Sequence, residues 1–572
     1  MTAVLTRELP GALLAPPALP RPPRRRRRPS SGTWWFLAAL AVYATVAVVL
    51  VLRHDGVMED AMARVSAASS VWTSSDPKLA AIGYVWTPLP VLLMVLAAPL
   101  RALWPGLVST GFLAAAVSAG AMASAVSTVW GLLGDRRVRT APRVVVTVGF
   151  ALAPMILFYA GNGMTEALLL ALLLAAVRRL LRWVDSADTV DLVAAGVLLG
   201  LGYLARYEAL AAAAGVTVVV ATVTALGPAR PPRLAPTARR RTAVVVDALV
   251  VAGPTALAFV LWAAVSWLVV GSPFEQFTSA YGNAALLSGS GVGAVSPTLP
   301  LRQITWLAPA LVPLLALALV RALARPHRRR AFALVGVPVA AFGAVLAFEA
   351  VTYLSGNLFG FLRYQITAIA LVVVLLALLL GRVPQPEART RGNRALRSTA
   401  AAVSAAVLLG AGWVTSGSAM LTEPVGATQE YHRVEPLVAA LRGAPVPTDS
   451  ALGMWASDRQ VAARLDALDL PPRSILADSG AAFAVVAASA HPERFLITSD
   501  DGFAAALADP PVHGIAVVLR ADVGGVDAVR TTWGSFGTPA APAWVRPLGT
   551  VAPATPSSTT WSLWGVTGAL AR

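Results

Sequence analysis

Long apolar stretches alternate with short polar segments along most of this sequence, from Trp34 to Val414. Each stretch has roughly 17–25 residues, which lets a helix cross a hydrocarbon core about 30 Å thick. The stretches lie at 34–52, 107–133, 144–161, 166–183, 190–206, 209–226, 243–270, 302–323, 332–354, 364–381 and 398–416. The pattern predicts an α-helical polytopic membrane protein with about 11 transmembrane helices.

One further apolar segment, 89–104, is shorter and is interrupted by Pro90, Pro99 and Arg101. Proline removes a helical hydrogen bond, and a charge is costly at membrane depth, so we expect a re-entrant or interfacial segment here. The composition agrees with a membrane class. Only 13% of the residues are charged and the mean hydropathy is +0.68, whereas soluble domains carry about 25% charged residues.

The net charge of +17 comes almost entirely from arginine, since Lys78 is the only lysine. Of the 46 basic residues, 29 lie in six places: Arg7 with 21–28, then 136–143, 178–182, 230–241, 321–330 and 382–397. Arginine-rich loops stay on the cytoplasmic side of the inner membrane, which predicts a cytoplasmic N-terminus and an external C-terminus. No aromatic residues interleave with these runs as nucleic-acid binding would need, so we expect no nucleic-acid partner.

Three regions follow from this pattern. Residues 1–33 form a Pro/Arg-rich tail that we expect to be disordered and cytoplasmic. Residues 34–416 form the transmembrane module, with an external loop at 53–88. Residues 418–572 regain Asp, Ser and His, and we expect an extracytoplasmic α/β domain with strands at 474–477, 495–498 and 514–519 and helices at 481–488 and 501–508. The strand–helix alternation predicts a small parallel sheet.

The unusual polar residues fall on the predicted external side. They are Glu59, Asp60, Arg64, Asp76 and Lys78 of loop 53–88, then Glu166, then Arg206, Tyr207 and Glu208, then Arg363. Ionisable residues at membrane depth persist where they face a cavity or each other. Guanidinium groups match phosphate oxygens, and a carboxylate can accept a hydroxyl proton. Together they predict a site for a phosphate-bearing substrate that reacts with a hydroxyl.

Each residue also has an ordinary structural explanation. Glu59 and Asp60 fit a solvated loop or the start of an interfacial helix. Arg206 and Glu208 fit a structural ion pair at a helix end, and Arg363 fits a side chain that reaches to lipid headgroups. Five histidines show no metal-binding spacing and the chain has no cysteine, so the sequence predicts neither a metal site nor a cofactor.

In these motifs the sequence resembles the GT-C superfamily of membrane glycosyltransferases. It is similar to the family-39-like branch, which includes protein O-mannosyltransferases and lipid A aminoarabinose transferases, and to its actinobacterial relatives. The resemblance covers most of 34–382 and rests on Glu59-Asp60-Ala61, on Asp76-Pro77-Lys78 with the residues up to Trp86, on Asn162-Gly163-Met164-Thr165-Glu166, on Arg206-Tyr207-Glu208, on Gly271-Ser272-Pro273-Phe274 and on Arg363-Tyr364.

The resemblance implies transfer of a hexosyl or pentosyl group, with inversion, from a polyprenyl-phosphate sugar to an acceptor hydroxyl on the external face. The acceptor would be a glycan, a lipid or a protein. The family's base, an acidic residue of the first external loop, falls on Asp60. The family pair is Asp-Glu and here it is Glu-Asp, so Glu59 stays an alternative, and Asp76 is a further candidate in the same loop. We expect Arg206 and Arg363 to contact the donor phosphate.

Two functions of other classes compete with this one. A transporter or flippase of a lipid-linked glycan would show internal repeats and charges near the membrane midplane. The sequence shows no repeat, and its charges lie at the outer ends of the helices. The other alternative is a structural membrane partner of an envelope assembly.

The predicted topology can be tested with a reporter that is active only in the cytoplasm, fused after Arg572. An odd number of crossings from a cytoplasmic N-terminus puts this fusion outside, so we expect no signal. The matched control is the same reporter inserted between Arg136 and Arg143, where activity is expected. Activity of the fusion after Arg572 would contradict the topology.

Overall fold

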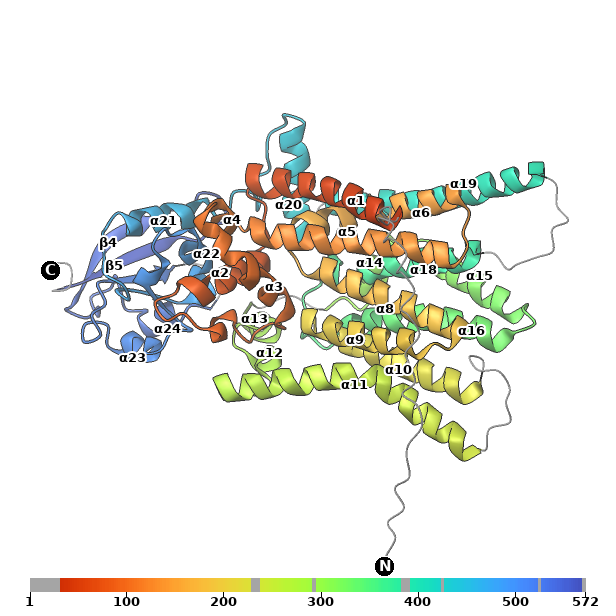
Figure 1. Cartoon of the computed structure of the whole chain (residues 1–572). Coiled ribbons are helices and arrows are strands. Elements are labelled where there is room, and N and C mark those ends of the chain that lie inside the picture. Colours follow the sequence, from red (N-terminus) through yellow and green to blue (C-terminus); the bar gives the residue numbers. More distant parts are fainter. Residues whose placement is uncertain are drawn as a thin grey trace, which may run out of the picture.

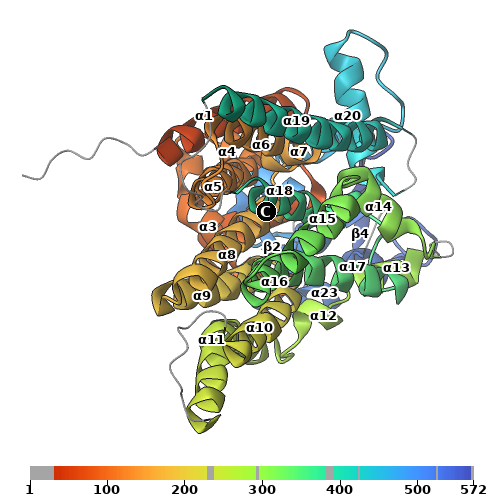
Figure 2. The same ribbon diagram turned by 90° about the vertical axis from the view of Figure 1, so that its right-hand side faces the viewer.

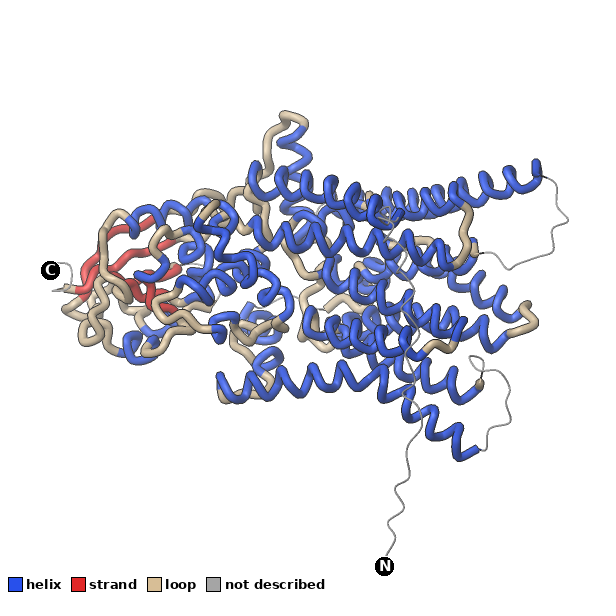
Figure 3. The backbone as a smooth tube through the Cα atoms, viewed as in Figure 1, coloured by secondary structure: helices blue, strands red, loops and turns tan. Residues whose placement is uncertain are grey.

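The computed structural model describes residues 31–227, 237–290, 295–381, 391–422, 426–522 and 526–567. Long helices run side by side in a bundle, and a smaller body that contains a β-sheet lies at one end (Figures 1 and 3). We call this end of the bundle the domain end and the opposite end the far end. Most of the predicted tail 1–33, and most of the basic segments 230–241 and 382–397, lie outside the described residues.

Seven helices among the described residues are long and apolar enough to cross a membrane. They are α1 with its π-helical end η1 (Ser31–Ala47, Val48–Arg53), α5 (Phe112–Asp135), α10 (Ala209–Leu226), α11 (Thr237–Val270), α16 with η4 and α17 (Arg328–Pro338, Val339–Gly343, Ala344–Leu354), η5 with α18 (Leu362–Gln365, Thr367–Leu380) and α19 (Arg391–Leu421). Two bent pairs raise this count to nine: α6 with α7 (Thr140–Ala151, Pro154–Gly161; 54°) and α14 with α15 (Leu299–Leu307, Leu311–Leu323; 77°). The α-helical polytopic membrane fold is confirmed.

Helices α8 (Glu166–Ser186) and α9 (Thr189–Ala205) account for the two remaining predicted crossings. α8 carries several charged residues in its second half, and α9 has only 17 residues. The two helices pack against each other, α8 also against α5 and α9 also against α11. Each predicted crossing thus coincides with a helix or a bent pair, while the number of about 11 crossings stays a prediction.

Helix α18 lies in the middle of the bundle, with α5, α6, α8, α15 and α16 packed around it (Figure 2). Its sequence is apolar at every position from Ala368 to Leu380. A helix that is hydrophobic on all faces is stable only where neighbours cover all of them. The short helix η5 precedes α18, so the central helix brings Arg363 to the domain end of the bundle.

The predicted external loop 53–88 contains helix α2 (Glu59–Thr73), so Glu59 and Asp60 begin a helix, as one of the two structural explanations for them expected. α2 begins with two acidic residues, Glu59 and Asp60, which favour a helix N-terminus because of its partial positive charge. A short helix η2 (Leu79–Ile82) follows, and then α3 (Leu89–Ala97), η3 (Ala98–Ala102) and α4 (Gly106–Ser109). α3 and η3 together extend about 21 Å, too short to cross a membrane, as predicted for 89–104.

The turn at Asn162 and Gly163 holds the first residues of α2 against the bundle. The Met58 N–H donates to the Asn162 carbonyl over 3.4 Å. Gly163 has φ +87°, and a Cβ there would lie 2.8 Å from Cβ of Ala61 and 2.9 Å from Cβ of Ala114. Only glycine combines that φ with such a close approach. Gly163 therefore determines how closely Asp60 and the start of α2 approach the bundle.

The body at the domain end contains a five-stranded sheet in the order β2-β1-β3-β5-β4. Its strands are β1 (Ile475–Ala477), β2 (Phe495–Ile497), β3 (Val517–Ala521), β4 (Val545–Val551) and β5 (Trp561–Val566). β1 pairs in parallel with β2 and β3, and helices α22 (Ser479–Ala488) and α23 (Phe503–Ala508) follow β1 and β2, which confirms the predicted alternation. The antiparallel pair β4 and β5 was missed. Two helices, α21 (Ala456–Asp466) and α24 (Ala528–Thr532), complete this body.

Several elements join the sheet body to the bundle. Helix α20 (Thr428–Leu441) packs on α19 and contacts η5. Arg459 binds the carboxylate of Asp55 through two hydrogen bonds of 2.9 and 2.6 Å. The segment between α11 and α14 contains helices α12 (Glu275–Thr278) and α13 (Asn283–Ser290), and from it Tyr281 donates to Asp478 over 2.9 Å. The predicted boundary at residue 418 lies inside α19, and α20 belongs with the helices rather than with the sheet.

We expect Gly163→Ala to lower the free energy of unfolding by about 1–3 kcal/mol, because the new methyl group overlaps Ala61 and Ala114. The matched control is Gly120→Ala in α5, where a Cβ meets nothing within 4 Å; this change should be neutral or slightly stabilising. Melting of the purified full-length protein in detergent measures both. Equal melting temperatures for the two variants would contradict the role of Gly163.

Candidate active site

Charged side chains from five separate helix ends meet at the domain end of the bundle. We call this group the charged cluster: Asp60, Arg64, Glu166, Arg206, Glu208, Glu349 and Arg363. Asp60 and Arg64 are on α2, Glu166 begins α8, and Glu349 is on α17. Arg206 and Glu208 join α9 to α10, and Arg363 is in η5. All members of the cluster except Glu349 were predicted as site residues.

Arg206 is the most fully paired member of the charged cluster. Its Nη1 lies 2.8 Å from Oε1 of Glu166, and its Nη2 forms an ion pair with Oε1 of Glu208. A third bond of 3.1 Å goes from Nη1 to the hydroxyl of Thr165. The guanidinium holds two carboxylates from different helices, so the predicted alternative of a structural ion pair applies to Arg206 and Glu208.

Glu349 is buried in α17, with an exposed fraction of 2%. Glu208 and Arg206 are its charged neighbours. Oε2 of Glu349 is buried without a hydrogen-bond partner, as is Oε2 of Glu208. The two carboxyl groups therefore leave buried oxygen atoms that a hydrogen-bond donor could satisfy.

Arg363 lies between two carboxylates and holds neither closely. Its Nη2 is 3.5 Å from Oδ2 of Asp60, and its Nε is 3.6 Å from Oε1 of Glu166. The guanidinium lies 5.2 Å from the ring centres of Phe361 and Tyr364. The Nε has no hydrogen-bond partner although it is buried. A buried guanidinium with an unused N–H can bind an added anion.

Arg64 is a second cation with unused hydrogen-bonding capacity. It is buried on α2, its guanidinium lies 4.5 Å from the ring centre of Trp86, and its Nη1 donates to the Asp60 carbonyl over 3.2 Å. Its Nε is buried without a partner. Trp86 and Arg64 therefore bring the predicted segment 76–86 and the start of α2 together at the charged cluster.

Asp60 is the most accessible acid of the cluster, with 36% of its side chain exposed. Burial raises the pKa of its carboxyl group, but the surrounding guanidinium groups of Arg363, Arg64 and Arg206 outweigh this effect, and the pKa lies below its ordinary value. Asp60 is therefore ionised at neutral pH, and its exposed face can accept a proton from a hydroxyl group.

Glu59 points to a different partner from its neighbour Asp60. Its Oε1 lies 2.8 Å from Nη2 of Arg433, a buried residue of α20. On the same helix, Glu430 accepts a hydrogen bond of 2.6 Å from the hydroxyl of Tyr159 in α7. Helix α20 is thus bound to both α2 and α7 beside the charged cluster.

Asp76 and Lys78 contact the sheet body instead of the charged cluster. Lys78 Nζ lies 2.7 Å from Asp76 and 2.7 Å from Asp501, and the Asp501 N–H donates to Asp76. The hydrogen bonds from Lys78 and Asp501 hold the pKa of Asp76 below its ordinary value. In the described part of the chain, no hydrogen bond or ion pair joins Asp76 or Lys78 to the cluster.

Tyr207 was predicted as a substrate-binding residue. Its ring packs against those of Phe277 and Phe348, with ring centroids 5.7 and 6.1 Å away.

Within the described ranges, no group of three or more His, Cys, Asp or Glu side chains is arranged to hold a metal ion.

Comparisons with known proteins were informative only at the level of three-dimensional structure. No family model and no curated protein matches the sequence. ArnT from Cupriavidus metallidurans, solved bound to undecaprenyl phosphate, superposes with a TM-score of 0.53 and 14% identity over 93% of this chain and 98% of its own. Its apo state gives a TM-score of 0.51 with 15% identity over the same shares of the two chains. The chain has the ArnT fold.

The predicted resemblance to GT-C membrane glycosyltransferases is thereby confirmed for the fold. A second similar structure, AglB from Archaeoglobus fulgidus in complex with an inhibitory peptide and a dolichol-phosphate, gives a TM-score of 0.40 with 12% identity over 86% of this chain and 69% of AglB. The ArnT fold covers the bundle and the sheet body together.

Four residues in or beside the charged cluster were not predicted as site residues: Glu349, which belongs to it, and Tyr159, Glu430 and Arg433, which lie beside it. Glu349 could have been predicted from the sequence, because it is a lone acidic residue inside an apolar span. Glu430 and Arg433 are three residues apart on one face of α20. This charged pair was not considered as part of the site because all residues after 418 were assigned to the sheet domain. Tyr159 lies in an apolar stretch of the sequence, and nothing in that stretch indicates a site residue.

Proposed function

We propose that this protein is a membrane glycosyltransferase that transfers a hexosyl or pentosyl group from a polyprenyl-phosphate-linked donor to an acceptor hydroxyl, with inversion. The reaction would take place at the domain end, which the sequence predicts to be extracytoplasmic. The observation that carries the proposal is Asp60, a partly exposed carboxylate 3.5 Å from the Arg363 guanidinium. The fold supports it, because ArnT has been solved bound to undecaprenyl phosphate.

In the proposed reaction, Asp60 accepts the proton of the acceptor hydroxyl while the oxygen of that hydroxyl attacks the anomeric carbon of the sugar. The bond from that carbon to the phosphate oxygen breaks, and polyprenyl phosphate leaves with the bonding electron pair. One glycosidic bond forms and one sugar–phosphate bond is lost. No nucleotide takes part, which agrees with a sequence that lacks a phosphate-binding glycine loop.

The leaving phosphate gains one negative charge in this step, so cations at the phosphate stabilise the transition state more than the ground state. Arg363 and Arg64 fit this role because each has a buried Nε without a partner. Arg206 is already paired with Glu166 and Glu208. We assign it an indirect role, in which it orients Glu166 and Arg363 for the donor.

Donor binding would also make Asp60 a better base. The pKa of Asp60 is held down by the neighbouring guanidinium groups. A phosphate that draws Arg363 toward itself weakens this pull, and the proton affinity of Asp60 then rises toward its ordinary value. Arrival of the donor and activation of the base are coupled through Arg363.

The other predicted substrate-binding residues divide into two groups. Glu166 and Glu208 each have a buried carboxylate oxygen without a hydrogen-bond partner, and sugar hydroxyls would supply donors for them. Tyr207 lies beside Glu208. Glu59, Asp76 and Lys78 are bound to α20 or to the sheet body, so their contribution would be to position α2 and the segment after it.

The function is tested by incubating membranes that contain the overproduced protein with a labelled polyprenyl-phosphate sugar. A glycosyltransferase converts the donor to polyprenyl phosphate and a labelled glycan, lipid or protein. A flippase or transporter would move the donor across the membrane without consuming it. An envelope-assembly partner would do neither, so the three candidate functions give different results.

Asp60→Asn should lower the rate of transfer by about 10²- to 10⁴-fold, because the amide keeps the size of the side chain and cannot accept the proton. Glu59→Gln is the matched control on the neighbouring residue, and it should cost much less because Glu59 is paired with Arg433. The transfer rate and the amount of folded protein are measured for both.

Asp76→Asn is measured in the same transfer assay as Asp60→Asn and Glu59→Gln, because Asp76 is the third candidate base. Wild-type turnover in Asp60→Asn together with loss in Asp76→Asn or Glu59→Gln would move the base to that residue. Full activity in all three variants would refute a base from 53–88.

Arg363→Gln should weaken binding of a polyprenyl-phosphate donor by about 10- to 100-fold, which corresponds to loss of one or two charge-assisted hydrogen bonds. Arg206→Gln should also weaken binding, through Glu166. Arg302→Gln is the control, since Arg302 is an exposed arginine of α14 that stacks on Trp306 at 5.3 Å. Wild-type affinity in both cluster variants would contradict a phosphate role for these arginines.

A further inference from the structure

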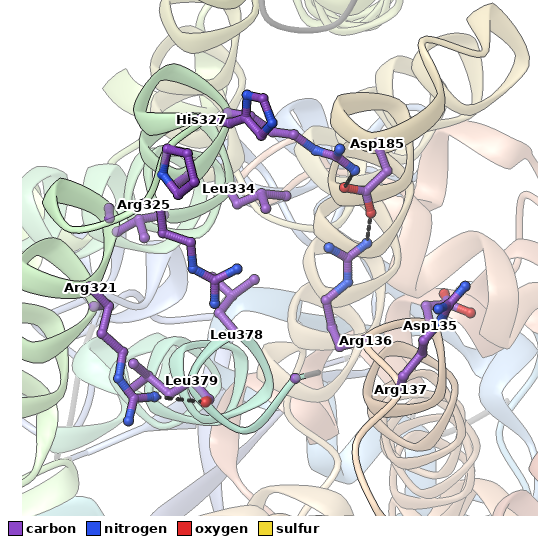
Figure 4. Close-up of a pocket in the computed structure, with 17 residues that line it drawn as sticks. Asp135, Arg136, Arg137, Asp185, Arg321, Arg325, His327, Leu334, Leu378 and Leu379 are labelled. Carbon is purple, nitrogen blue, oxygen red and sulfur yellow. Dashed lines mark hydrogen bonds and ion pairs between the residues drawn. The ribbon is translucent and has the colours of Figure 1, made fainter. Parts of the chain in front are cut away.

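A pocket of about 840 Å³ lies at the far end of the bundle, where the ends of α5, α8, α15, α16 and α18 meet (Figure 4). The residues that decide its chemistry are five arginines, two aspartates and an apolar wall. The arginines are Arg136, Arg137, Arg321, Arg325 and Arg330, and the aspartates are Asp135 and Asp185. The wall includes Ala318, Leu334, Val335, Leu378 and Leu379.

The two aspartates are already engaged, so they leave part of the positive charge unbalanced. Asp185 pairs with Arg136 and with Arg330, the latter over 2.7 Å (Figure 4). Asp135 pairs over 2.7 Å with Arg178, which does not line the pocket. Both carboxylates are therefore neutralised by other arginines.

Two cations remain for a ligand. Arg321 donates to the backbone carbonyl of Leu379 over 2.8 Å, which leaves its charge uncompensated. For Arg325, no ion pair with another described residue occurs. Arg137 also lines the pocket, but it lies beside Asp135, away from Arg321 and Arg325 (Figure 4). Two guanidinium groups on one side of a pocket, without carboxylate partners, can bind phosphate oxygens.

Next to the pocket lies an apolar surface of α15, which a small soluble anion would not use. Along α15, whose residues Ala318, Arg321 and Ala322 line it, large apolar side chains are exposed. Leu317 is 43% exposed, Val320 61% and Leu323 52%. In a membrane-spanning helix such a surface faces lipid chains. A ligand with a phosphate group and hydrocarbon chains would match both parts.

The pocket is separate from the charged cluster. Glu166 of α8 belongs to the cluster and Asp185 of the same helix lines the pocket, about 28 Å farther along at 1.5 Å per residue. The Arg-loop pattern predicts that the far end faces the cytoplasm, where anionic phospholipids bind basic pockets between transmembrane helices.

We propose that this pocket binds the headgroup of an anionic glycerophospholipid, with its phosphate held by Arg321 and Arg325. The acyl chains would extend over the exposed apolar side chains of α15. The proposal does not depend on the proposed glycosyltransferase activity, because no residue of the charged cluster takes part.

The test is binding of lipids to the purified full-length protein in detergent. Dioleoyl phosphatidylglycerol, dioleoyl phosphatidylcholine and inorganic phosphate are added separately, and bound lipid is counted by native mass spectrometry. We expect phosphatidylglycerol to bind in preference to phosphatidylcholine. Arg325→Gln should weaken phosphatidylglycerol binding about fivefold, and Arg321→Gln with Arg325→Gln about 25-fold, since each arginine near a lipid surface contributes about fivefold in affinity.

Two control variants separate charge from folding. Arg328→Gln removes an exposed arginine of α16 that does not line the pocket, and it should bind phosphatidylglycerol as the wild type does. Arg325→Lys keeps the charge and should retain most of the affinity. Equal binding of the two lipids, or equal losses in Arg325→Gln and Arg328→Gln, would overturn the proposal. Displacement of the lipid by an equal concentration of inorganic phosphate would show a site for soluble phosphate and overturn the lipid assignment.

Discussion

The arrangement of the domain end depends on the pairing of arginines that are removed from water. A buried guanidinium without a counter-charge costs several kcal/mol. Arg206, Arg363 and Arg433 obtain carboxylates from helices other than their own. Because each pair joins two elements, α2, α8, the junction of α9 and α10, η5 and α20 are held together at this end. The same pairs keep unlike charges a few ångströms apart in a part of the structure that is largely removed from water.

The sequence was sufficient to predict the helices and most of the cluster, for one physical reason. A charged residue at the end of an apolar span is conspicuous, and the order of spans assigns it to one side of the membrane. Asp60, Arg206 and Arg363 were found in this way, and the structure brings them together. The alternation of strands and helices likewise predicted the parallel part of the sheet.

What the sequence could not predict is which charge pairs with which. Glu59 and Asp60 are adjacent, but successive residues of a helix point about 100° apart. One therefore pairs with α20 and the other lies near Arg363. Asp76 and Lys78 share the predicted loop with Asp60, but the helix α2 separates them and they pair with Asp501 instead. Strand β5 was missed because it is buried at every position and lacks the alternation of a half-exposed strand. Strand β4 was missed because it contains Pro547 and Gly549, where its register shifts, and both residues are uncommon inside strands.

Three helical segments have charged residues or hydrogen-bonded polar groups near both of their ends. α8 has Glu166 and Asp185, and the α16 to α17 span has Arg330 and Glu349. α18 has Arg363 before it, and at its last turn the Leu379 carbonyl accepts from Arg321. Such a helix cannot slide along the membrane normal without moving one charged end into hydrocarbon, which costs about 2.5–3.5 kcal/mol per charge. Polar groups at the two ends therefore fix the depth of the bundle. Because α8 and the α16 to α17 span each have a residue of the charged cluster near one end, the same constraint fixes the position of the cluster relative to the hydrocarbon layer.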